Sequence, residues 1–160
     1  SNARKGFDTL LWVDAHLDWT RFEVVYMGGT PKSGFEPIHI SILPQEDSHG
    51  VAEFLRTGDI YLAPSRDEPA SNAVMEALAC GLPVLYQEGS SHGDLVGSAG
   101  RGFPHPGPEL IQALDDMVQN YDNLRRAIAV PTMMDVSRKY LAIMRWCFYM
   151  KHLFFETQKK

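Results

Sequence analysis

Two glutamates, Glu68 and Glu76, are the residues most suited to chemistry in this chain, and seven residues separate them. Glu76 is the only charged residue in the segment from 71 to 80, which is otherwise mostly apolar. A segment that is apolar nearly all round is typical of a helix buried between a sheet and other helices. Because burying a lone carboxylate costs several kcal/mol, we expect Glu76 to have hydrogen-bond donors around it.

The start of this predicted helix suits an anion. Asn72 and Glu76 are four residues apart and therefore share one helix face. Free backbone N–H groups near Ser71 and Asn72, together with the positive end of the helix dipole, would attract a phosphate. Glu76, one turn further along, could accept hydrogen bonds from the diol of a ribose. A phosphate beside a ribose indicates a nucleotide.

Glu68 precedes the predicted helix on a loop. Its backbone is biased toward an extended conformation because Pro69 follows it. From that loop its carboxylate could reach the same site and accept hydrogen bonds from paired sugar hydroxyls. The residues alone leave two plainer alternatives open: Glu68 is solvated, or Glu76 pairs with an internal arginine or lysine.

Alternating strands and helices must position these residues. The pattern predicts an α/β fold, a Rossmann-like parallel sheet with helices on both faces in three layers, and such sheets bind ligands at the carboxyl ends of their strands. Strands are predicted at 22–27, 38–43, 59–63 and 84–86, with a brief extended piece at 102–103. Helices are predicted at 7–19, 48–57 (with Ser48 as its N-cap), 71–80, 94–99, 108–120, 122–129 and about 132–157.

The ends of the chain indicate a fragment of a longer protein. Residues 1–3 look like the remnant of a cleaved expression tag, which leaves 4–160 as a single domain with a long C-terminal helix. The native part begins abruptly at Arg4, and no strand precedes the first helix. We therefore expect a domain that lacks its first strand.

Composition restricts the class of protein. Hydrophobic residues make up 44 % and charged residues 22 %, the profile of an ordinary globular protein. A net charge of −5 argues against nucleic acid as a partner. Cys80 and Cys147 show no metal-ligand spacing, and with no secretory signal we expect reduced thiols and a cytoplasmic protein.

The helix at 132–157 is apolar, but Arg145 and Lys151 interrupt it, so we do not expect it to cross a membrane. We expect it to dock on a missing partner domain. A lesser alternative is peripheral contact with the cytoplasmic face of a membrane, through Trp146 and nearby phenylalanines. His92, in a Gly/Ser-rich loop, is expected to be solvated.

The stretch from Pro64 to Val84 resembles the signature of family 4 retaining glycosyltransferases of the GT-B fold. In that family two glutamates separated by seven residues stand in a strand–loop–helix setting, followed by Gly-x-Pro-Val, as at Gly81–Val84. The resemblance implies that Glu68 contacts the donor sugar and that Glu76 contacts the nucleotide ribose. It also implies that this chain is the C-terminal, donor-binding domain.

Three weaker matches support the resemblance. The stretch Gly89–Val96 is similar to the family's glycine loop before an acidic residue, with Asp94 where glutamate is common. Lys5-Gly6 is similar to the Lys-Gly that opens the first helix of the family's C-terminal domain, where the lysine contacts the donor diphosphate. Gly28-Gly29 is similar to the glycine turn after the second strand. One departure is Pro69-Ala70-Ser71, where family members often have Gly-Phe-Gly.

The resemblance implies transfer of a sugar, with retention, from a UDP-, GDP- or ADP-sugar to an acceptor saccharide, lipid or small molecule, without a cofactor or an essential metal. The acceptor site would lie in the missing N-terminal GT-B domain, so we expect little or no activity from this chain alone. Two alternatives stay open: a non-catalytic scaffold, and a nucleotide-sugar epimerase of the same fold. The residues implied are Glu68 and Lys5 as catalytic, and Glu76, Ser71, Asn72, Ala70, Gly28 and Gly29 as substrate-binding.

Overall fold

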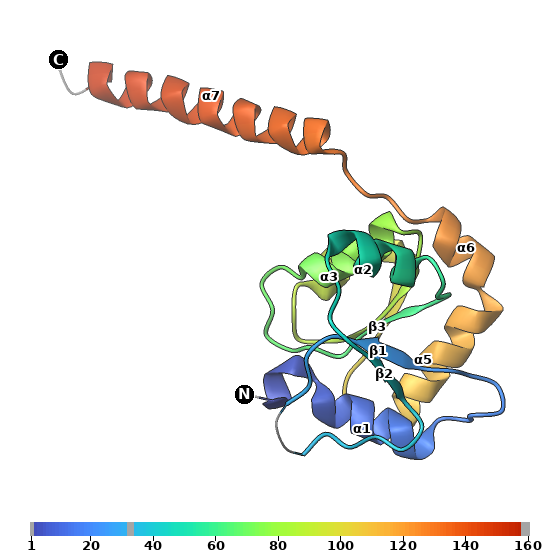
Figure 1. Ribbon diagram of the computed structural model, residues 1–160. Helices are drawn as coiled ribbons and strands as arrows, with labels where there is room; N and C mark the ends of the chain where they lie inside the picture. The colour runs from blue at the N-terminus through green and yellow to red at the C-terminus, as the bar shows by residue number, and fades with distance from the viewer. Residues whose placement is uncertain (1, 32–33, 158–160) are drawn as a thin grey trace. The chain divides into compact units, whose positions relative to one another are not determined.

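The computed structural model describes the backbone of residues 2–31 and 34–157, and the side chains of residues 4–31 and 34–150 (Figure 1). The chain forms two compact units, Ser1–Ala129 and Val130–Lys160. The first unit contains every predicted site residue. Its elements are η1 (Asn2–Lys5), α1 (Phe7–His16), β1 (Val25–Met27), β2 (Ser41–Leu43), α2 (Ser48–Leu55), β3 (Tyr61–Ala63), α3 (Asn72–Ala79), β4 (Val84–Gln87), α4 (His92–Val96), η2 (Gly97–Ala99), β5 (Gly100–Phe103), α5 (Pro108–Gln119) and α6 (Tyr121–Arg126).

All the described strand pairs are parallel, and they form two ladders. One joins β1 to β2, and the other has the order β3-β4-β5. In the second ladder Tyr61 pairs with Val84, and Val84 pairs with Gly100. The predicted α/β fold of parallel strands with helices on both faces is confirmed. The carboxyl ends of β3 and β4 consequently lie at the same edge, where the sequence places Glu68 and the Gly/Ser loop.

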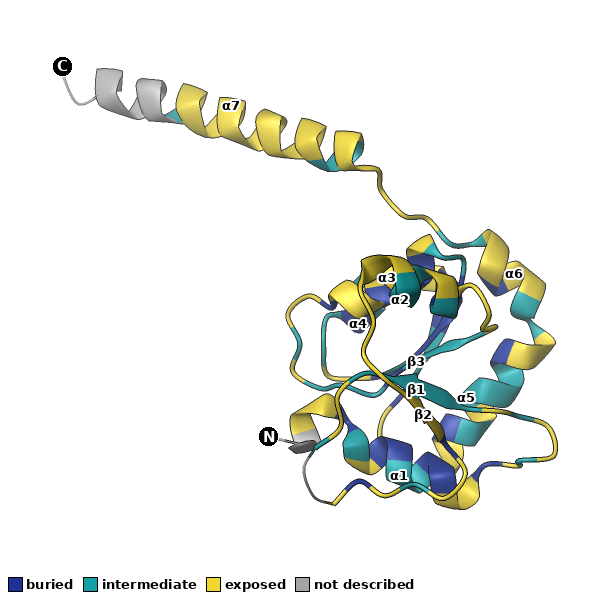
Figure 2. Cartoon of the chain, viewed as in Figure 1, coloured by how far each residue is buried: buried dark blue, intermediate teal, exposed yellow. Residues whose placement is uncertain are grey.

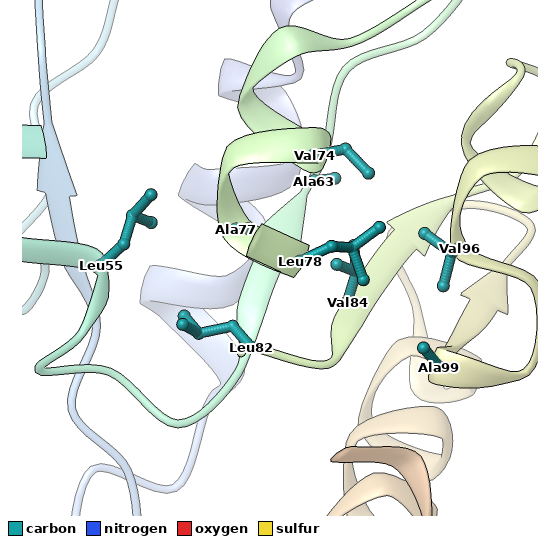
Figure 3. Close-up of a cluster of buried hydrophobic side chains, with 9 residues drawn as sticks. All are labelled: Leu55, Ala63, Val74, Ala77, Leu78, Leu82, Val84, Val96 and Ala99. Atoms are coloured by element: carbon teal, nitrogen blue, oxygen red, sulfur yellow. The ribbon is translucent and has the colours of Figure 1, made fainter. Parts of the chain in front are cut away.

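Consecutive residues of β4 show why the fold has three layers. Side chains alternate between the two faces of a strand. Val84 belongs to a buried cluster with α2, α3 and α4, whereas Leu85 belongs to a cluster with α1, α5 and α6. Figure 3 shows the first cluster, with Val74, Ala77 and Leu78 of α3 turned toward the strands. Burial on both faces explains the continuous apolar run of β4.

Asp14 joins α1 to the segment that leads into β2. Its carboxylate accepts hydrogen bonds from the backbone N–H groups of Ile38, His39 and Ile40, at 2.8, 2.8 and 2.9 Å. Asp14 is only 6 % exposed. Burial raises the pKa of this carboxyl, but the three backbone donors and the nearby His39 outweigh that effect and leave the pKa below its ordinary value. One buried charge therefore satisfies three backbone groups that have no strand partner.

Caps set the start of two further helices. Asp47, not the predicted Ser48, caps α2, and its carboxylate accepts from the backbone N–H groups of His49 and Gly50. The second unit contains α7 (Met133–Thr157), where the Thr132 hydroxyl and Asp135 bond to each other's backbone N–H groups.

The described part of α7 exposes large apolar side chains along its length (Figure 2). Tyr140, Met144 and Trp146 are each exposed over more than half of their surface. None of the described helices is long and apolar enough to cross a membrane. The side chains of Lys151 and of the phenylalanines beyond it lie outside the described residues.

We predict that Asp14→Asn lowers the free energy of unfolding by about 3 kcal/mol, because a neutral amide cannot accept from three buried N–H donors. The folded-state pKa of Asp14 lies below its ordinary value of about 3.9. Its contribution is therefore fully present above pH 4 and is lost as the pH falls through the folded-state pKa. Urea unfolding between pH 7 and pH 2.5 should show a shallower acid dependence in the variant. The exposed Asp59 provides the control, and an Asp59→Asn variant with the same loss would contradict the prediction.

Candidate functional site

The site is assembled by a close backbone contact between Gly6 and Pro64. Gly6 has a φ of +73°, and a Cβ atom placed on it would lie 2.2 Å from the Pro64 carbonyl oxygen. Two hydrogen bonds continue this contact: the Arg66 N–H donates to the Arg4 carbonyl at 2.9 Å, and the Arg4 guanidinium donates to the Asp67 carbonyl at 2.8 Å. The segment before α1 therefore lies along the loop that follows β3.

This contact brings Lys5 to Glu68. The Lys5 ammonium donates to Glu68 Oε1 at 3.2 Å, and the Ser65 hydroxyl donates to Glu68 Oε2 at 3.2 Å. Burial raises the pKa of the Glu68 carboxyl, but the bond and charge of Lys5, with the hydroxyls of Ser65 and Ser71, bring it below its ordinary value. The Glu68 side chain is 21 % exposed and that of Lys5 is 68 % exposed. Glu68 is thus an ionised acceptor within a partly covered surface, not a freely solvated side chain.

The loop that carries Glu68 has a constrained backbone. Asp67 has a φ of +55°, in the left-handed region that aspartate tolerates better than most residues. Ser91 donates to the Glu68 carbonyl twice, from its backbone N–H at 3.2 Å and from its hydroxyl at 3.1 Å. The loop after β4 therefore fixes the loop after β3. Pro69 and Ala70, which follow Glu68, are exposed at the surface.

The helix α3 follows this loop, and Ser71 caps it. The Ser71 hydroxyl accepts from the Val74 N–H at 3.4 Å, and Ser71 itself is buried. Val74, Ala77 and Leu78 pack in the core, whereas Asn72 and Glu76 lie on the exposed side. The four-residue spacing placed Asn72 and Glu76 on a common face, and both are available at the surface.

The prediction that Glu76 is buried among apolar groups is wrong. The helix is amphipathic, and its exposed side includes small or apolar residues such as Ala73 and Met75. Solvent satisfies the Glu76 carboxylate, so it needs no buried donor. Within the described part of the chain it forms no hydrogen bond or ion pair, which also removes the alternative of an internal arginine or lysine partner.

Tyr61 is a buried residue whose pKa responds to both glutamates, and it was missed by sequence reasoning. Burial raises the pKa of its phenol to about 12, and the negative charges of Glu68 and Glu76 add to this, followed by Tyr26. Both carboxylates therefore act on the phenol of the first residue of β3. The phenol stays neutral at physiological pH and can donate a hydrogen bond. The available signal was its position in a strand that ends just before Glu68.

The Gly28-Gly29 turn is held in place by Tyr26. Gly28 has a φ of +136°, and a Cβ atom there would lie 3.4 Å from the Tyr26 hydroxyl oxygen. The Tyr26 hydroxyl donates to the Gly29 carbonyl at 2.9 Å. Among the described residues, no hydrogen bond or ion pair joins this turn to Lys5, Glu68 or Glu76, so the structure does not bring it together with them by direct contact.

Two buried polar residues were also missed. Gln87, the last residue of β4, accepts from the Thr9 hydroxyl at 3.0 Å and from the Arg66 guanidinium at 3.3 Å. Arg66 also forms an ion pair with Asp8 in the first turn of α1. These contacts hold α1 to the ends of β3 and β4. His92, expected to be solvated, is instead fully buried at the start of α4.

Other features of the surface do not coincide with this site. A hollow of about 410 Å³ is lined by Asp122, Arg125 and Arg126, none of which is a predicted site residue. Among the residues that the structure describes, no group of three or more histidine, cysteine, aspartate or glutamate side chains is arranged to hold a metal ion.

Residues 36–129, more than half of the chain, match the family described as glycosyl transferases group 1. The chain belongs to this family. The matched region begins before β2 and ends after α6, so it includes both glutamates, the whole of α3 and the loop that contains Ser91. A comparison with curated proteins gave no match.

Among solved structures, this chain is similar to the sucrose-phosphate synthase of Thermosynechococcus elongatus, with a TM-score of 0.67 and 18 % sequence identity. The likeness covers 92 % of this chain and 43 % of the synthase. The fold is therefore that of part of a GT-B glycosyltransferase, and the chain spans less than half the length of the synthase.

We predict that Gly6→Ala lowers the free energy of unfolding by about 2 to 5 kcal/mol, because the new methyl group meets a backbone carbonyl in addition to the strain of a positive φ. Gly34→Ala is the matched control, since Gly34 has a φ of +79° with nothing within 4 Å. That variant should lose about 1 kcal/mol, from backbone strain alone. Equal losses for the two variants, measured by urea unfolding, would show that the contact with Pro64 has no energetic weight.

We predict a second effect in alkaline solution. The folded-state pKa of Tyr61 is raised to about 12, above the value of about 10 in an unfolded chain. The stability linked to this group is fully present below pH 10 and is lost as the pH rises toward 12. Between pH 9 and pH 11, Tyr61→Phe should therefore lose less stability than the wild type, whereas Tyr140→Phe, at an exposed position, should match it. If the stability of the wild type and of Tyr61→Phe fell equally with rising pH, the raised pKa of Tyr61 would be refuted.

Proposed function

We propose that this chain is the donor-binding part of a glycosyltransferase that transfers a sugar from a nucleotide-sugar with retention at the anomeric carbon. The observation that carries the proposal is the contact between Lys5 and Glu68, which are 63 positions apart in the chain, beside the N-terminus of α3. A cation, an ionised acceptor and a helix N-terminus at one sheet edge suit a ligand that combines phosphates with hydroxyls.

In this proposal the diphosphate lies between Lys5 and the start of α3. The Lys5 ammonium is largely exposed, so it can turn toward an anion at little cost. The first backbone N–H groups of α3 point out of the helix, and Ser71 already satisfies that of Val74. Negative charge grows on the diphosphate as the bond to the sugar breaks, so donors held in place here stabilise the transition state more than the bound substrate.

Glu76 binds the ribose of the nucleotide. Its carboxylate is exposed one turn along α3 from Asn72 and carries acceptors only, which match the two hydroxyl donors of a ribose. Neither oxygen has a protein partner among the described residues, so ligand binding breaks no internal bond.

Glu68 binds the donor sugar. Its lowered pKa keeps it an ionised acceptor, and hydrogen bonds to charged acceptors are stronger than those between neutral groups. In this proposal Ala70, with its small exposed side chain, and the Gly28-Gly29 turn also contact the donor. Acceptor binding would belong to a further domain, and we propose that this chain alone binds the donor without transferring the sugar.

We predict that the chain binds at least one of UDP, GDP and ADP in calorimetric titrations. Glu76→Gln should weaken that binding by about tenfold, because it weakens charge-assisted hydrogen bonds to the ribose. Lys5→Ala should also weaken it and should flatten its salt dependence. Glu23→Gln is the control, because Glu23 is exposed and precedes β1, at the opposite edge of the sheet from the site.

If none of the three nucleotides binds, or if Glu76→Gln binds as tightly as the wild type, the proposal fails and the scaffold alternative gains support. Where a nucleotide binds, product analysis separates the two enzymatic outcomes. In the full-length protein, transfer yields a glycosylated acceptor with the anomeric configuration of the donor. Epimerisation yields an altered sugar without any acceptor.

A further inference from the structure

His92 is a buried polar side chain without a hydrogen-bond partner. It is 0 % exposed, and within the described part of the chain neither Nδ1 nor Nε2 makes a hydrogen bond. Burying such a group unpaired costs about 1 to 3 kcal/mol. The family signature between Pro64 and Val84 does not require it, and packing alone would favour an apolar residue at this position.

The imidazole is directed at the Glu68 carboxylate. Its Nε2 lies 3.8 Å from Glu68 Oε2. A hydrogen bond between these atoms would need a separation of about 3.2 Å or less. The Tyr86 ring packs edge-on against the imidazole with the ring centres 6.4 Å apart. The preceding residue, Ser91, holds the Glu68 backbone through two hydrogen bonds. A small rotation of the carboxylate would therefore close the gap without any change in the backbone.

The present partner of Glu68 is suited to leave it. Lys5 binds Oε1 at 3.2 Å and is 68 % exposed, so the bond is long and its loss costs little. A diphosphate carries more negative charge than a carboxylate and competes for the same ammonium. When Lys5 turns to the diphosphate, Oε1 loses its charged partner, and without another donor the carboxylate would be held only by the neutral hydroxyls of Ser65 and Ser71.

We propose that His92 is a positioning residue that donates from Nε2–H to Glu68 Oε2 once Lys5 has turned to the donor diphosphate. Oε1 is then free to accept a hydrogen bond from a hydroxyl of the donor sugar. The inference rests on the proposed function, since it assigns each oxygen of Glu68 a partner in the donor complex. Diphosphate binding and sugar binding are thereby coupled through Lys5 and Glu68.

The test uses the nucleoside diphosphate that binds best among UDP, GDP and ADP, and the matching nucleotide-glucose. His92→Leu removes the donor and keeps a buried apolar side chain, whereas His92→Gln keeps an N–H donor of similar reach. We expect His92→Leu to bind the nucleoside diphosphate within about threefold of the wild type and the nucleotide-glucose about tenfold more weakly. His92→Gln should remain within about threefold for both ligands.

Thermal unfolding separates positioning from folding. Because the imidazole is unpaired in the free chain, His92→Leu should not lower the unfolding temperature. In the wild type, nitrogen-15 spectra should show a proton fixed on Nε2 of His92 when the nucleotide-glucose saturates the site, and this measurement needs no variant. An unchanged His92 signal at saturation would overturn the inference.

The binding results distinguish this inference from the proposed function. If no nucleoside diphosphate binds the wild type, both fail. If it binds, and His92→Leu leaves the affinity for nucleotide-glucose unchanged or weakens both ligands equally, the positioning role fails and donor binding stands. Failure of His92→Gln to restore sugar affinity would likewise exclude Nε2 as the donor.

Discussion

The site depends on one steric constraint, the absence of a side chain at Gly6 where its backbone meets the Pro64 carbonyl. This contact fixes the segment before α1 against the end of β3. The hydrogen bonds of Arg4 to the loop, the pairing of Lys5 with Glu68 and the buried bond between Thr9 and Gln87 all follow from it. A helix and two strands that are distant in sequence thereby share one edge.

The negative charge at this edge of the sheet explains why a single lysine, Lys5, is important for attracting an anion. Glu68 and Glu76 both act electrostatically on the phenol of Tyr61, on a chain whose net charge is −5. Such a surface repels anions unless cations or oriented backbone dipoles offset it. Lys5 and the N-terminus of α3 are those elements here. The same ammonium pairs with Glu68 in the free chain, so under the proposed function the site exchanges an internal ion pair for an external one when a diphosphate binds.

The sequence predicted the order of elements well, because periodicity and the Gly and Pro residues at element ends are local signals. It also brought Lys5, Glu68 and Glu76 into one hypothesis, but only through the family resemblance. It failed for Glu76, whose neighbours Ala73 and Ala79 look like core residues yet lie at the surface. It failed for His92, because a Gly/Ser-rich loop gives no sign of tertiary burial. The three donors around Asp14 come from residues more than 20 positions away, and no local pattern reports them.

The separation of α1 from its partners has a consequence for how the protein is made. Lys5 and Glu68 are 63 positions apart, and Thr9 and Gln87 are 78 positions apart. At about 5 to 20 residues per second on the ribosome, α1 emerges roughly 4 to 16 s before the strand that completes its contacts. Within that interval Leu10 of α1 can already pack on Phe35 and Ile40, because both emerge before β4. The contacts Lys5–Glu68 and Thr9–Gln87 therefore form after this first apolar cluster, once β3, its following loop and β4 have been synthesised.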